Sequence, residues 1–252
     1  MMPKLGVSTK IFSRKHWFDD MQGYPVECIE INTRTNLFWF VDDRIEKIRP
    51  KYERFNLSMH SGISMPFRGN EQFTKMKLEL LRSEIIACSM IGAKELIFHL
   101  HHDKLSENEA VRIREIIDFA KSKGVDMVYE SNGVCVAEIA LDFLKRFPDV
   151  GYNLDLGHLN NGHGRGMLGC PIDEFLKDLK DRTVYIHAHG NNGKKDQHLA
   201  LRKGTLDWKH VFDVLDMSNV RKVISETNDK EDAEMNLEDL NEYFGQDGLK
   251  SI

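Results

Sequence analysis

Short runs of β-branched and aromatic residues recur along the chain. Several of these runs are apolar at consecutive positions, which is typical of strands that are covered on both faces. Eight runs are predicted to be strands, and they are Lys4–Ser8, Glu27–Asn32, Asn56–His60, Glu95–His99, Asp126–Glu130, Val150–Asp155, Thr183–His187 and Lys222–Glu226. The regular recurrence of these runs indicates a large sheet.

Segments with helical spacing lie between the predicted strands. Apolar residues recur at three- and four-residue intervals in two of the segments, and we expect them to form buried helix faces. The first set is Phe73, Met76, Leu80, Leu81, Ile85, Cys88 and Ile91, and the second is Val111, Ile113, Ile116, Ile117 and Ala120. Gly124 is expected just past the end of the second helix, where a left-handed residue commonly stands.

Strict alternation of about eight strands with about eight helices predicts parallel βα units. Right-handed crossovers can close eight such units into a barrel, and a doubly wound open sheet is the rival architecture. Against the open sheet, the first strand is followed by Ser8-Thr9-Lys10 and not by a glycine-rich nucleotide-binding turn. No linker or repeat divides the chain. We therefore expect an α/β fold in which residues 1–252 form a single (β/α)8 TIM-barrel domain.

Composition narrows the class of protein. The 252 residues are 41% apolar and 30% charged, which excludes a disordered or collagen-like chain. The formal net charge of −5 gives no global positive field that would attract nucleic acid. The four cysteines are scattered, no apolar stretch is long enough to cross a membrane, and no leader peptide precedes the first strand. A cytoplasmic protein with reduced thiols and no membrane partner is the expectation.

Metal-ligand side chains stand at the ends of six successive predicted strands or just beyond them. A TIM barrel builds its active site at this end, so these side chains are expected to converge. They are His60, His99, Glu130, Asp155, His158, His187, Asp196, His198 and Glu226. Imidazoles and carboxylates are ligands of Zn²⁺, Mn²⁺ and Fe²⁺, and so many buried charges would be costly without a cation. The joint pattern predicts a metal site.

Each of these residues could have a structural role when it is considered alone, for example as a hydrogen-bonded core histidine or a helix cap. The metal prediction therefore depends on the whole ordered set. Five further histidines are not expected to be ligands: His101, His102, His163, His189 and His210. Glu30 ends the second strand and could add a polar group to the pocket.

The nine residues resemble the xylose-isomerase-like barrel superfamily over nearly the whole chain. Its core of a glutamate, an aspartate, a histidine and a glutamate on strands five to eight matches Glu130, Asp155, His187 and Glu226. Within the superfamily, the further matches are to the endonuclease IV family, and they are His60, His99, His158, the Asp196-x-His198 pair and the downstream Gly204-Thr205-Leu206. The resemblance thus implies a counterpart for every ligand of a trinuclear zinc cluster.

The chain departs from endonuclease IV in the segments expected to contact DNA. His60 is followed by Ser61-Gly62-Ile63, where the family typically has a Pro-Tyr whose aromatic ring contacts DNA. His99 is followed by Leu100-His101 instead of Pro-Gly. Arg202-Lys203 displaces the usual glycine after the Asp-x-His loop. The resemblance therefore supports the metal ligands more firmly than it supports a DNA substrate.

The leading functional prediction is metal-dependent hydrolysis of a phosphodiester, with DNA containing an abasic site as the substrate. Up to three Zn²⁺ would bind, or Mn²⁺ or another divalent ion, and a bound ion would supply hydroxide at neutral pH. Glu130 and Glu226 would be the catalytic carboxylates that bridge ions. Arg34, Arg202 and Lys203 would bind phosphate. The aromatic segment Phe38-Trp39-Phe40 could stack on a base or pack in the core.

The alternative is a single-metal isomerase or epimerase of a small sugar or hydroxy-ketone. One ion on the superfamily core would polarise a carbonyl, and Glu130 and Glu226 would move the proton. This alternative leaves His60, His99, Asp196 and His198 without a clear task. The metal content, the substrate and the oligomeric state stay open at this point.

Overall fold

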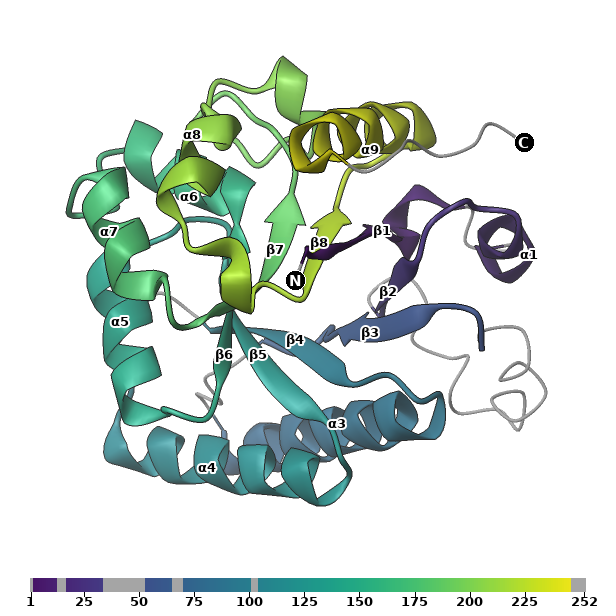
Figure 1. Ribbon diagram of the computed structural model, residues 1–252. Helices are drawn as coiled ribbons and strands as arrows, with labels where there is room; N and C mark the ends of the chain where they lie inside the picture. The colour runs from purple at the N-terminus through teal and green to yellow at the C-terminus, as the bar shows by residue number, and fades with distance from the viewer. Residues whose placement is uncertain (1, 13–16, 34–52, 65–69, 101–103, 246–252) are drawn as a thin grey trace.

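Eight parallel strands close into a barrel in the order of the sequence (Figure 1). The structure, a computed structural model, describes residues 2–12, 17–33, 53–64, 70–100 and 104–245. The strands are β1 (Lys4–Ser8), β2 (Cys28–Asn32), β3 (Asn56–His60), β4 (Glu95–Leu100), β5 (Asp126–Ser131), β6 (Gly151–Asp155), β7 (Thr183–Ala188) and β8 (Lys222–Ser225). The barrel closes where β1 pairs with β8. The predicted TIM-barrel fold is confirmed, and every strand lies within one residue of its predicted bounds.

Helices surround the barrel and follow the strands (Figure 1). The α-helices of the described residues are α1 (Trp17–Gln22), α3 (Glu71–Met90), α4 (Glu107–Ser122), α5 (Ala137–Arg146), α6 (Leu156–Gly164), α7 (Ile172–Leu179), α8 (Trp208–Val214) and α9 (Lys230–Phe244). Three short 3₁₀ helices are η1 (Thr9–Ile11), η2 (Leu201–Lys203) and η3 (Met217–Asn219).

Local sequence accounts for the ends of several helices. Ser106 and Glu109 form a reciprocal capping box at the start of α4, which satisfies backbone N–H groups that the first turn cannot pair. Gly124 follows the end of α4 with a positive φ of 70°, so the predicted left-handed glycine is confirmed. Asp229 caps α9, and Gly245 ends it in the left-handed region.

The predicted buried face of α3 is correct only in part. Leu81, Ile85, Cys88 and Ile91 are buried, but Phe73 is 57% exposed, Met76 47% and Leu80 39%. At about 100° per residue, the exposed residues lie roughly 100° around the helix from the stripe centred on Leu81. A helix that packs on a barrel buries one stripe of side chains along its length. Three- and four-residue spacing also connects residues of the neighbouring stripe, so spacing alone does not show which stripe is buried. Val111 of α4 is exposed as well.

Two hydrophobic clusters support the barrel. The larger one lies between the sheet and the helices. The smaller one contains Cys28, Ile97, Val128, Tyr185 and Ile224. Near it, the ammonium of Lys222 donates to Glu95 Oε2 at 2.8 Å, and both residues begin their strands and are buried. The amino end of the barrel interior is thus occupied, and the carboxyl end is left for a site.

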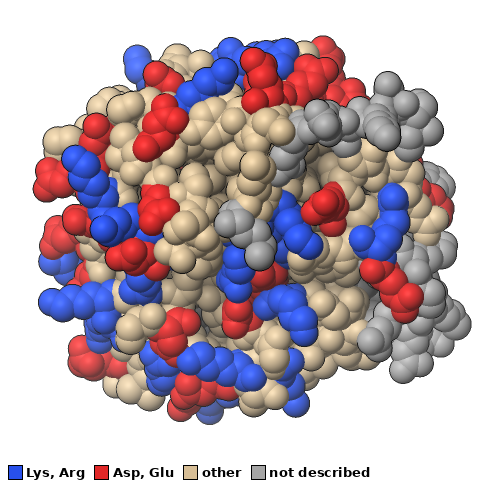
Figure 2. All heavy atoms as spheres, viewed as in Figure 1, with Lys and Arg blue, Asp and Glu red and all other residues tan. Residues whose placement is uncertain are grey.

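The surface carries both signs of charge. Figure 2 shows acidic and basic side chains interspersed over the face in view. Within the described part of the chain, no helix combines the length and the apolar character needed to cross a bilayer. The expectation that residues 1–252 form one domain and the expectation of a cytoplasmic location stay predictions.

Candidate metal centre

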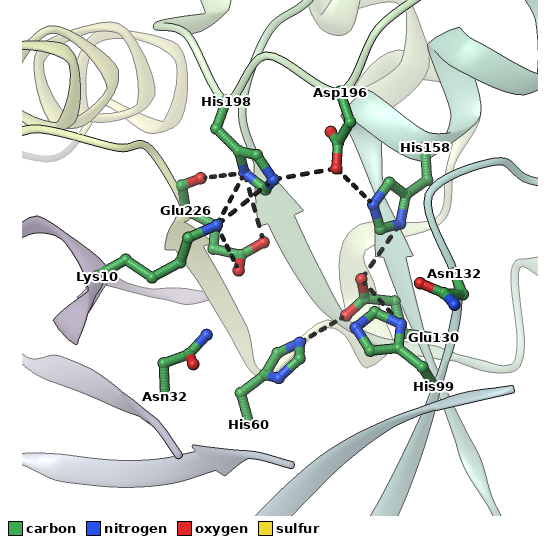
Figure 3. A pocket seen from close by; sticks show the side chains of 10 residues that line it. All are labelled: Lys10, Asn32, His60, His99, Glu130, Asn132, His158, Asp196, His198 and Glu226. Carbon is green, nitrogen blue, oxygen red and sulfur yellow. Dashed lines mark hydrogen bonds and ion pairs between the residues drawn. The ribbon is translucent and has the colours of Figure 1, made fainter. Parts of the chain in front are cut away.

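A pocket with a volume of about 200 Å³ opens at the carboxyl ends of the strands (Figure 3). Its lining is almost entirely polar, and it consists of Lys10, Asn32, His60, His99, Glu130, Asn132, His158, Asp196, His198 and Glu226. Seven of the nine residues predicted as metal ligands are among them. The other two, Asp155 and His187, are buried beneath the pocket and contact its lining.

Four carboxylate and imidazole side chains converge at the floor of the pocket. His187 Nδ1 lies 3.0 Å from Glu130 Oε2, 3.4 Å from Glu226 Oε2 and 3.7 Å from Asp155 Oδ2. All four residues are buried. The three carboxylates thus surround His187 Nδ1, and potential ligand atoms of Glu130, Asp155 and His187 lie within 4.8 Å of one another.

Strand register explains why the ligands meet. His99 on β4 is directly opposite Glu130 on β5, and Asp155 on β6 is opposite His187 on β7. Asp155 also caps α6, because its Oδ1 accepts the backbone N–H of His158 at 2.7 Å. This cap places His158 in the first turn of α6, next to Asp155.

One hydrogen bond on each of three histidines determines which ring nitrogen faces the carboxylates. His187 Nε2 donates to Glu30 Oε2 at 2.8 Å, so the neutral ring would present its Nδ1 lone pair to a metal ion. His60 Nδ1 donates to the Ser61 carbonyl at 3.1 Å, and His198 Nδ1 donates to the Glu226 carbonyl at 2.7 Å. Glu30 therefore acts through His187, beneath the pocket and not in its lining.

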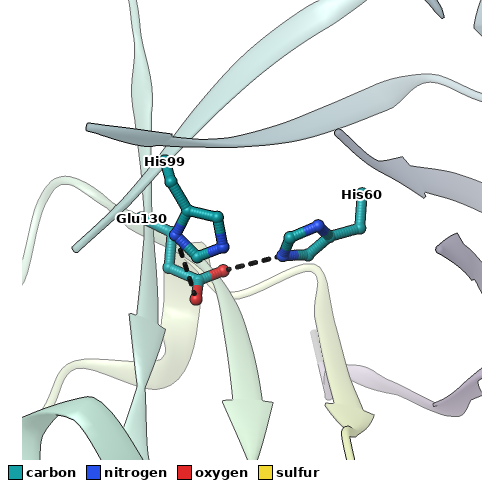
Figure 4. A group of neighbouring side chains, drawn as sticks. All are labelled: His60, His99 and Glu130. Carbon is teal, nitrogen blue, oxygen red and sulfur yellow. Dashed lines mark ion pairs between the residues drawn. The ribbon is translucent and has the colours of Figure 1, made fainter. Parts of the chain in front are cut away.

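Two further donor groups flank the four central residues. On one side, His60 Nε2 lies 3.6 Å from Glu130 Oε2 and His99 Nδ1 lies 3.7 Å from Glu130 Oε1 (Figure 4). On the other side, Asp196 Oδ2 lies 3.4 Å from His158 Nε2 and 3.1 Å from His198 Nε2. Potential ligand atoms in each of several triplets of these residues lie within 4.8 Å of one another.

The loop after β7 holds Asp196 and His198 in an unusual conformation. His198 is the non-glycine residue in the described chain with positive φ, at 50°. A histidine in this region costs conformational energy, and such strain is common at functional sites. The backbone bridge between Gly190 and Leu199 closes the base of the loop. The loop is thereby fixed over β7 and β8.

His189 is closer to the site than the sequence indicated. It is 1% exposed, and its Nε2 lies 3.0 Å from Asp155, while its ring stacks on His198 with the ring centroids 4.0 Å apart. Gly157 leaves room for this ring, because a Cβ there would lie 1.9 Å from His189 Cε1. His189 also belongs to two of the potential ligand triplets. Its position two residues after His187, on the same face of β7, was the available signal.

Lys10 is the other site residue that the sequence did not single out. Its Nζ lies 3.3 Å from Glu226 Oε1 and 3.3 Å from His198 Nδ1. Nothing in the pattern around Lys10 distinguishes it from a surface lysine. Asn32, at the end of β2, and Asn132, after β5, complete the polar lining.

Electrostatic coupling shifts the titration of the buried groups in opposite directions. Burial lowers the pKa of His187, but Glu30, Glu130 and Glu226 raise it, and the net pKa lies well above the usual value. Burial also lowers the pKa of His158, but Asp155 and other carboxylates raise it well above its usual value. Burial raises the pKa of Glu130, whereas His99 and His187 lower it far below its usual range. Protons on the imidazoles therefore balance the carboxylates where an ion is absent.

The donor set fits a divalent metal ion. Glu130 Oε1, His158 Nδ1 and His187 Nδ1 are buried and make no well-aligned hydrogen bond in the described part of the chain, although His158 Nδ1 lies 3.2 Å from Glu130 Oε1 and His187 Nδ1 lies 3.0 Å from Glu130 Oε2. Buried polar atoms are normally paired, so their convergence indicates a missing partner. Imidazole and carboxylate ligands suit Zn²⁺, Mn²⁺ and Fe²⁺.

The predicted phosphate-binding residues occupy other positions. Arg202 forms ion pairs with Glu238 and Asp239 of α9, and Lys203 forms one with Asp232, so neither belongs to the pocket lining. Arg34 and Phe38-Trp39-Phe40 fall outside the described residues, as do His101 and His102. His163 and His210 are exposed, and their exclusion as ligands stays a prediction. The substrate-binding roles of Arg34, Arg202 and Lys203 stay predictions.

Comparison with known proteins places the chain in a family. The family described as the xylose isomerase-like TIM barrel matches residues 18–244. Two uncharacterised proteins of Methanocaldococcus jannaschii are similar. MJ1311 is 25% identical over 79% of this chain and 73% of its own length, and MJ1614 is 23% identical over 96% and 99%.

Solved structures share the fold at lower identity. A D-tagatose 3-epimerase-like protein superposes with a TM-score of 0.79 at 21% identity and covers 96% of this chain and 97% of its own. The TTHB071 protein from Thermus thermophilus, soaked with ZnCl₂, has a TM-score of 0.74 at 16% identity, over 98% and 99% of the two chains. The IolI protein with a bound zinc atom has a TM-score of 0.71 at 16% identity, over 96% and 95%. The chain belongs to the xylose isomerase-like TIM-barrel family.

Proposed function

We propose that this protein is a metal-dependent isomerase or epimerase of a small sugar or hydroxy-ketone. The observation that carries the proposal is the convergence of Glu130, Asp155, Glu226 and His187 Nδ1 at the floor of a small polar pocket. A volume of about 200 Å³ corresponds to roughly seven waters of liquid volume, which matches a small metabolite. A lining of imidazole, amide and carboxylate groups suits a substrate with several hydroxyl groups.

The proposed reaction moves a proton next to a carbonyl group. A divalent ion held by the four central residues would polarise the carbonyl and the adjacent hydroxyl, which makes the neighbouring C–H more acidic. Glu130 and Glu226 remain ionised because their pKa values lie far below neutrality. In an isomerase, the carboxylate that takes the proton from carbon becomes a carboxylic acid and returns the same proton to the adjacent carbon. In an epimerase, the second carboxylate would first take a proton from solvent and deliver it to the opposite face, and the first would release its proton to solvent.

The surroundings support distinct roles for the two carboxylates. Asn153 Nδ2 donates to Glu130 Oε2 at 2.7 Å, which orients that carboxylate from beneath. Glu226 instead pairs with Lys10, whose Nζ lies 3.3 Å from Glu226 Oε1 (Figure 3). Asn32 lines the pocket together with His60 and His99, which are two of the four residues that the single-metal alternative left without a task. All three would bind substrate hydroxyl groups.

The comparisons support a sugar substrate only at the level of the fold. Besides the D-tagatose 3-epimerase-like protein, a D-psicose 3-epimerase solved with D-tagatose superposes with a TM-score of 0.68 at 12% identity, over 89% of this chain and 84% of its own. The names of these proteins make ketoses a reasonable first set of substrates to screen. The argument for a metal-dependent proton transfer stands on the residues of this chain.

Hydrolysis of a phosphodiester is the second candidate, and the flanking donor groups favour it. His60 and His99 on one side of Glu130, and His158, Asp196 and His198 on the other, offer ligands for up to two more ions. Two or three zinc ions could position and activate a water for attack on phosphorus. Endonuclease action on DNA with an abasic site would then be the activity.

Metal content and activity separate the two candidates. We expect one firmly bound divalent ion per chain after purification without chelator, and turnover of a ketose or hydroxy-ketone in a screen with added Mn²⁺, Co²⁺ or Zn²⁺. Replacing either Glu130 or Glu226 by glutamine should lower kcat at least about 100-fold, because the group that moves the proton is lost.

The double variant Asp196→Ala/His198→Ala distinguishes the isomerase from the hydrolase. In the proposed function it keeps the single bound ion. The isomerase proposal would be overturned if the wild type binds about three zinc ions and cleaves abasic-site DNA, and if the variant loses both one zinc ion and the cleavage activity. The exposed pair Asp173 and His210, whose Oδ1 and Nε2 lie 2.9 Å apart, provides the matched control Asp173→Ala/His210→Ala.

A further inference from the structure

Lys10 places a positive charge at the edge of the candidate metal centre. We propose that Lys10 binds an anionic group of the substrate, so that the substrate is a small polyhydroxy compound carrying a phosphate or a carboxylate. This inference rests on the proposed function, because it assumes that the pocket holds a divalent ion and a small substrate.

The backbone around Lys10 aims its side chain into the pocket. Lys10 lies in η1, directly after β1, between two buried residues. One of them, Thr9, accepts the backbone N–H of Asn32 at 2.9 Å, and the other, Ile11, packs in the core. Figure 3 shows the Lys10 side chain extending towards Glu226 and His198, and only 20% of it is exposed.

The present partners of Lys10 are groups that a metal ion would also use. Its Nζ lies 3.3 Å from Glu226 Oε1 and 3.3 and 3.4 Å from the two ring nitrogens of His198. His198 Nδ1 already donates to the Glu226 carbonyl, so the histidine offers the ammonium little as an acceptor. A lysine ammonium has three protons to donate and needs acceptors for them. Glu226 is therefore its main partner, and a metal ion would compete for that partner.

The arrangement of charges around Lys10 favours an anion at this point. Among the described residues that line the pocket, Lys10 is the single lysine or arginine, and its ammonium lies 3.3 Å from Glu226 Oε1. A divalent ion held by the four central residues would draw the Glu226 carboxylate towards itself, so that Lys10 would need another acceptor. A negatively charged group of the substrate would serve as that acceptor far better than a neutral hydroxyl group.

The competing interpretation is that Lys10 only neutralises Glu226. In that case, its removal changes metal binding and leaves the choice of ligand unaffected. Three three-carbon polyols separate the interpretations: glycerol 3-phosphate, glycerate and glycerol. All three have two adjacent hydroxyl groups, and they differ at the third carbon, which carries a phosphate, forms a carboxylate or carries a neutral hydroxyl group. Glycerol is therefore the neutral reference for the two anions.

Binding of the three compounds is measured by isothermal titration calorimetry on the full chain loaded with Co²⁺. We expect the wild type to prefer at least one anionic compound over glycerol by about tenfold or more. Lys10→Met should lose most of that preference and leave the affinity for glycerol unchanged. Lys10→Arg should retain it, and Lys4→Met, at the exposed start of β1, is the matched control.

The calorimetry tests the role of Lys10, and the cobalt content tests the metal centre. Loss of the preference in Lys10→Met for glycerol 3-phosphate alone identifies a phosphate, and loss for glycerate alone identifies a carboxylate. An unchanged preference in Lys10→Met, or no preference in the wild type, overturns the role of Lys10. Cobalt content, measured on the same samples, reports separately on the metal centre and shows whether the variant is correctly folded, so failure of the proposed function is recognised independently.

Discussion

At the scale of single residues, hydrogen bonds beneath the pocket determine which atoms the site presents. Glu30 binds His187 Nε2, and Tyr185 in turn donates to Glu30 at 3.0 Å, so the ring of His187 is held by two successive buried contacts. His189 does the same for Asp155. Ligands supported in this way lose little conformational entropy when a metal ion binds, which strengthens the complex.

His189→Asn tests the role of His189 as a positioning residue. The variant removes the 3.0 Å contact to Asp155, so we expect metal affinity to fall by about 10- to 100-fold, the usual effect of losing such a partner. The affinity is measured by competition with a chelator. His210→Asn, at an exposed histidine, is the control and should bind metal as the wild type does. Equal affinities in the two variants would show that His189 is not needed to orient Asp155.

At the scale of elements, helix α3 ties together the loops that follow β2 and β3. Glu84 is buried on its inner face and accepts hydrogen bonds from Thr33 Oγ1 at 2.7 Å and from the Gly62 N–H at 3.0 Å, as well as from the Ser61 hydroxyl. Burial raises the pKa of Glu84, and these donors oppose the shift. The position of Ser61 matters because its carbonyl accepts from His60.

Replacing Glu84 by alanine should destabilise the protein by about 2 kcal/mol, because the Gly62 N–H loses its acceptor and the hydroxyls of Thr33 and Ser61 keep only their backbone acceptors. Glu79→Ala on the same helix removes an exposed ion pair with Arg82 and should cost about 0.5 kcal/mol or less. Urea unfolding of the metal-free proteins measures both free energies. A similar cost for the two variants would contradict the proposed role of Glu84 in joining the loops.

At the scale of the whole molecule, barrel closure gathers a dense set of ionisable groups. The pKa values of His60, His158, His187 and His198 are raised, so the folded metal-free protein holds more protons than the unfolded chain. Their contribution to stability is present at low pH and is lost as pH rises through the raised pKa values. Glu130, Asp155 and Glu226 have lowered pKa values and stay ionised from pH 5 to 8, so they do not offset this trend.

The stabilisation that a bound metal ion provides should therefore increase with pH. Ligand imidazoles must be neutral, so protons compete with the ion, and the competition weakens above the raised histidine pKa values. The Tm difference between zinc-loaded and chelator-treated protein should be larger at pH 8 than at pH 6. Thermal unfolding at matched ionic strength measures it. A difference independent of pH would show that these histidines do not bind the ion.

Much of the architecture could be predicted from the sequence because the relevant signals are local. Apolar runs and helical spacing depend on neighbouring residues, so all eight strands lie within one residue of their predicted bounds, and the capping glycine after α4 is where it was expected. The same locality explains the error in α3. Spacing alone does not show which of two adjoining stripes faces the barrel, and Phe73, Met76 and Leu80 lie on the exposed one.

The sequence by itself determined the fold class and the set of residues at the carboxyl ends of the strands. The order of Glu130, Asp155, His187 and Glu226 along the chain already indicated the family. Only the tertiary structure decided how side chains from different strands meet. It brought His189 against Asp155, directed Lys10 towards Glu226, and paired Arg202 with α9. The physical reason is that such contacts depend on strand register, barrel closure and side-chain rotation, which join residues far apart in the chain.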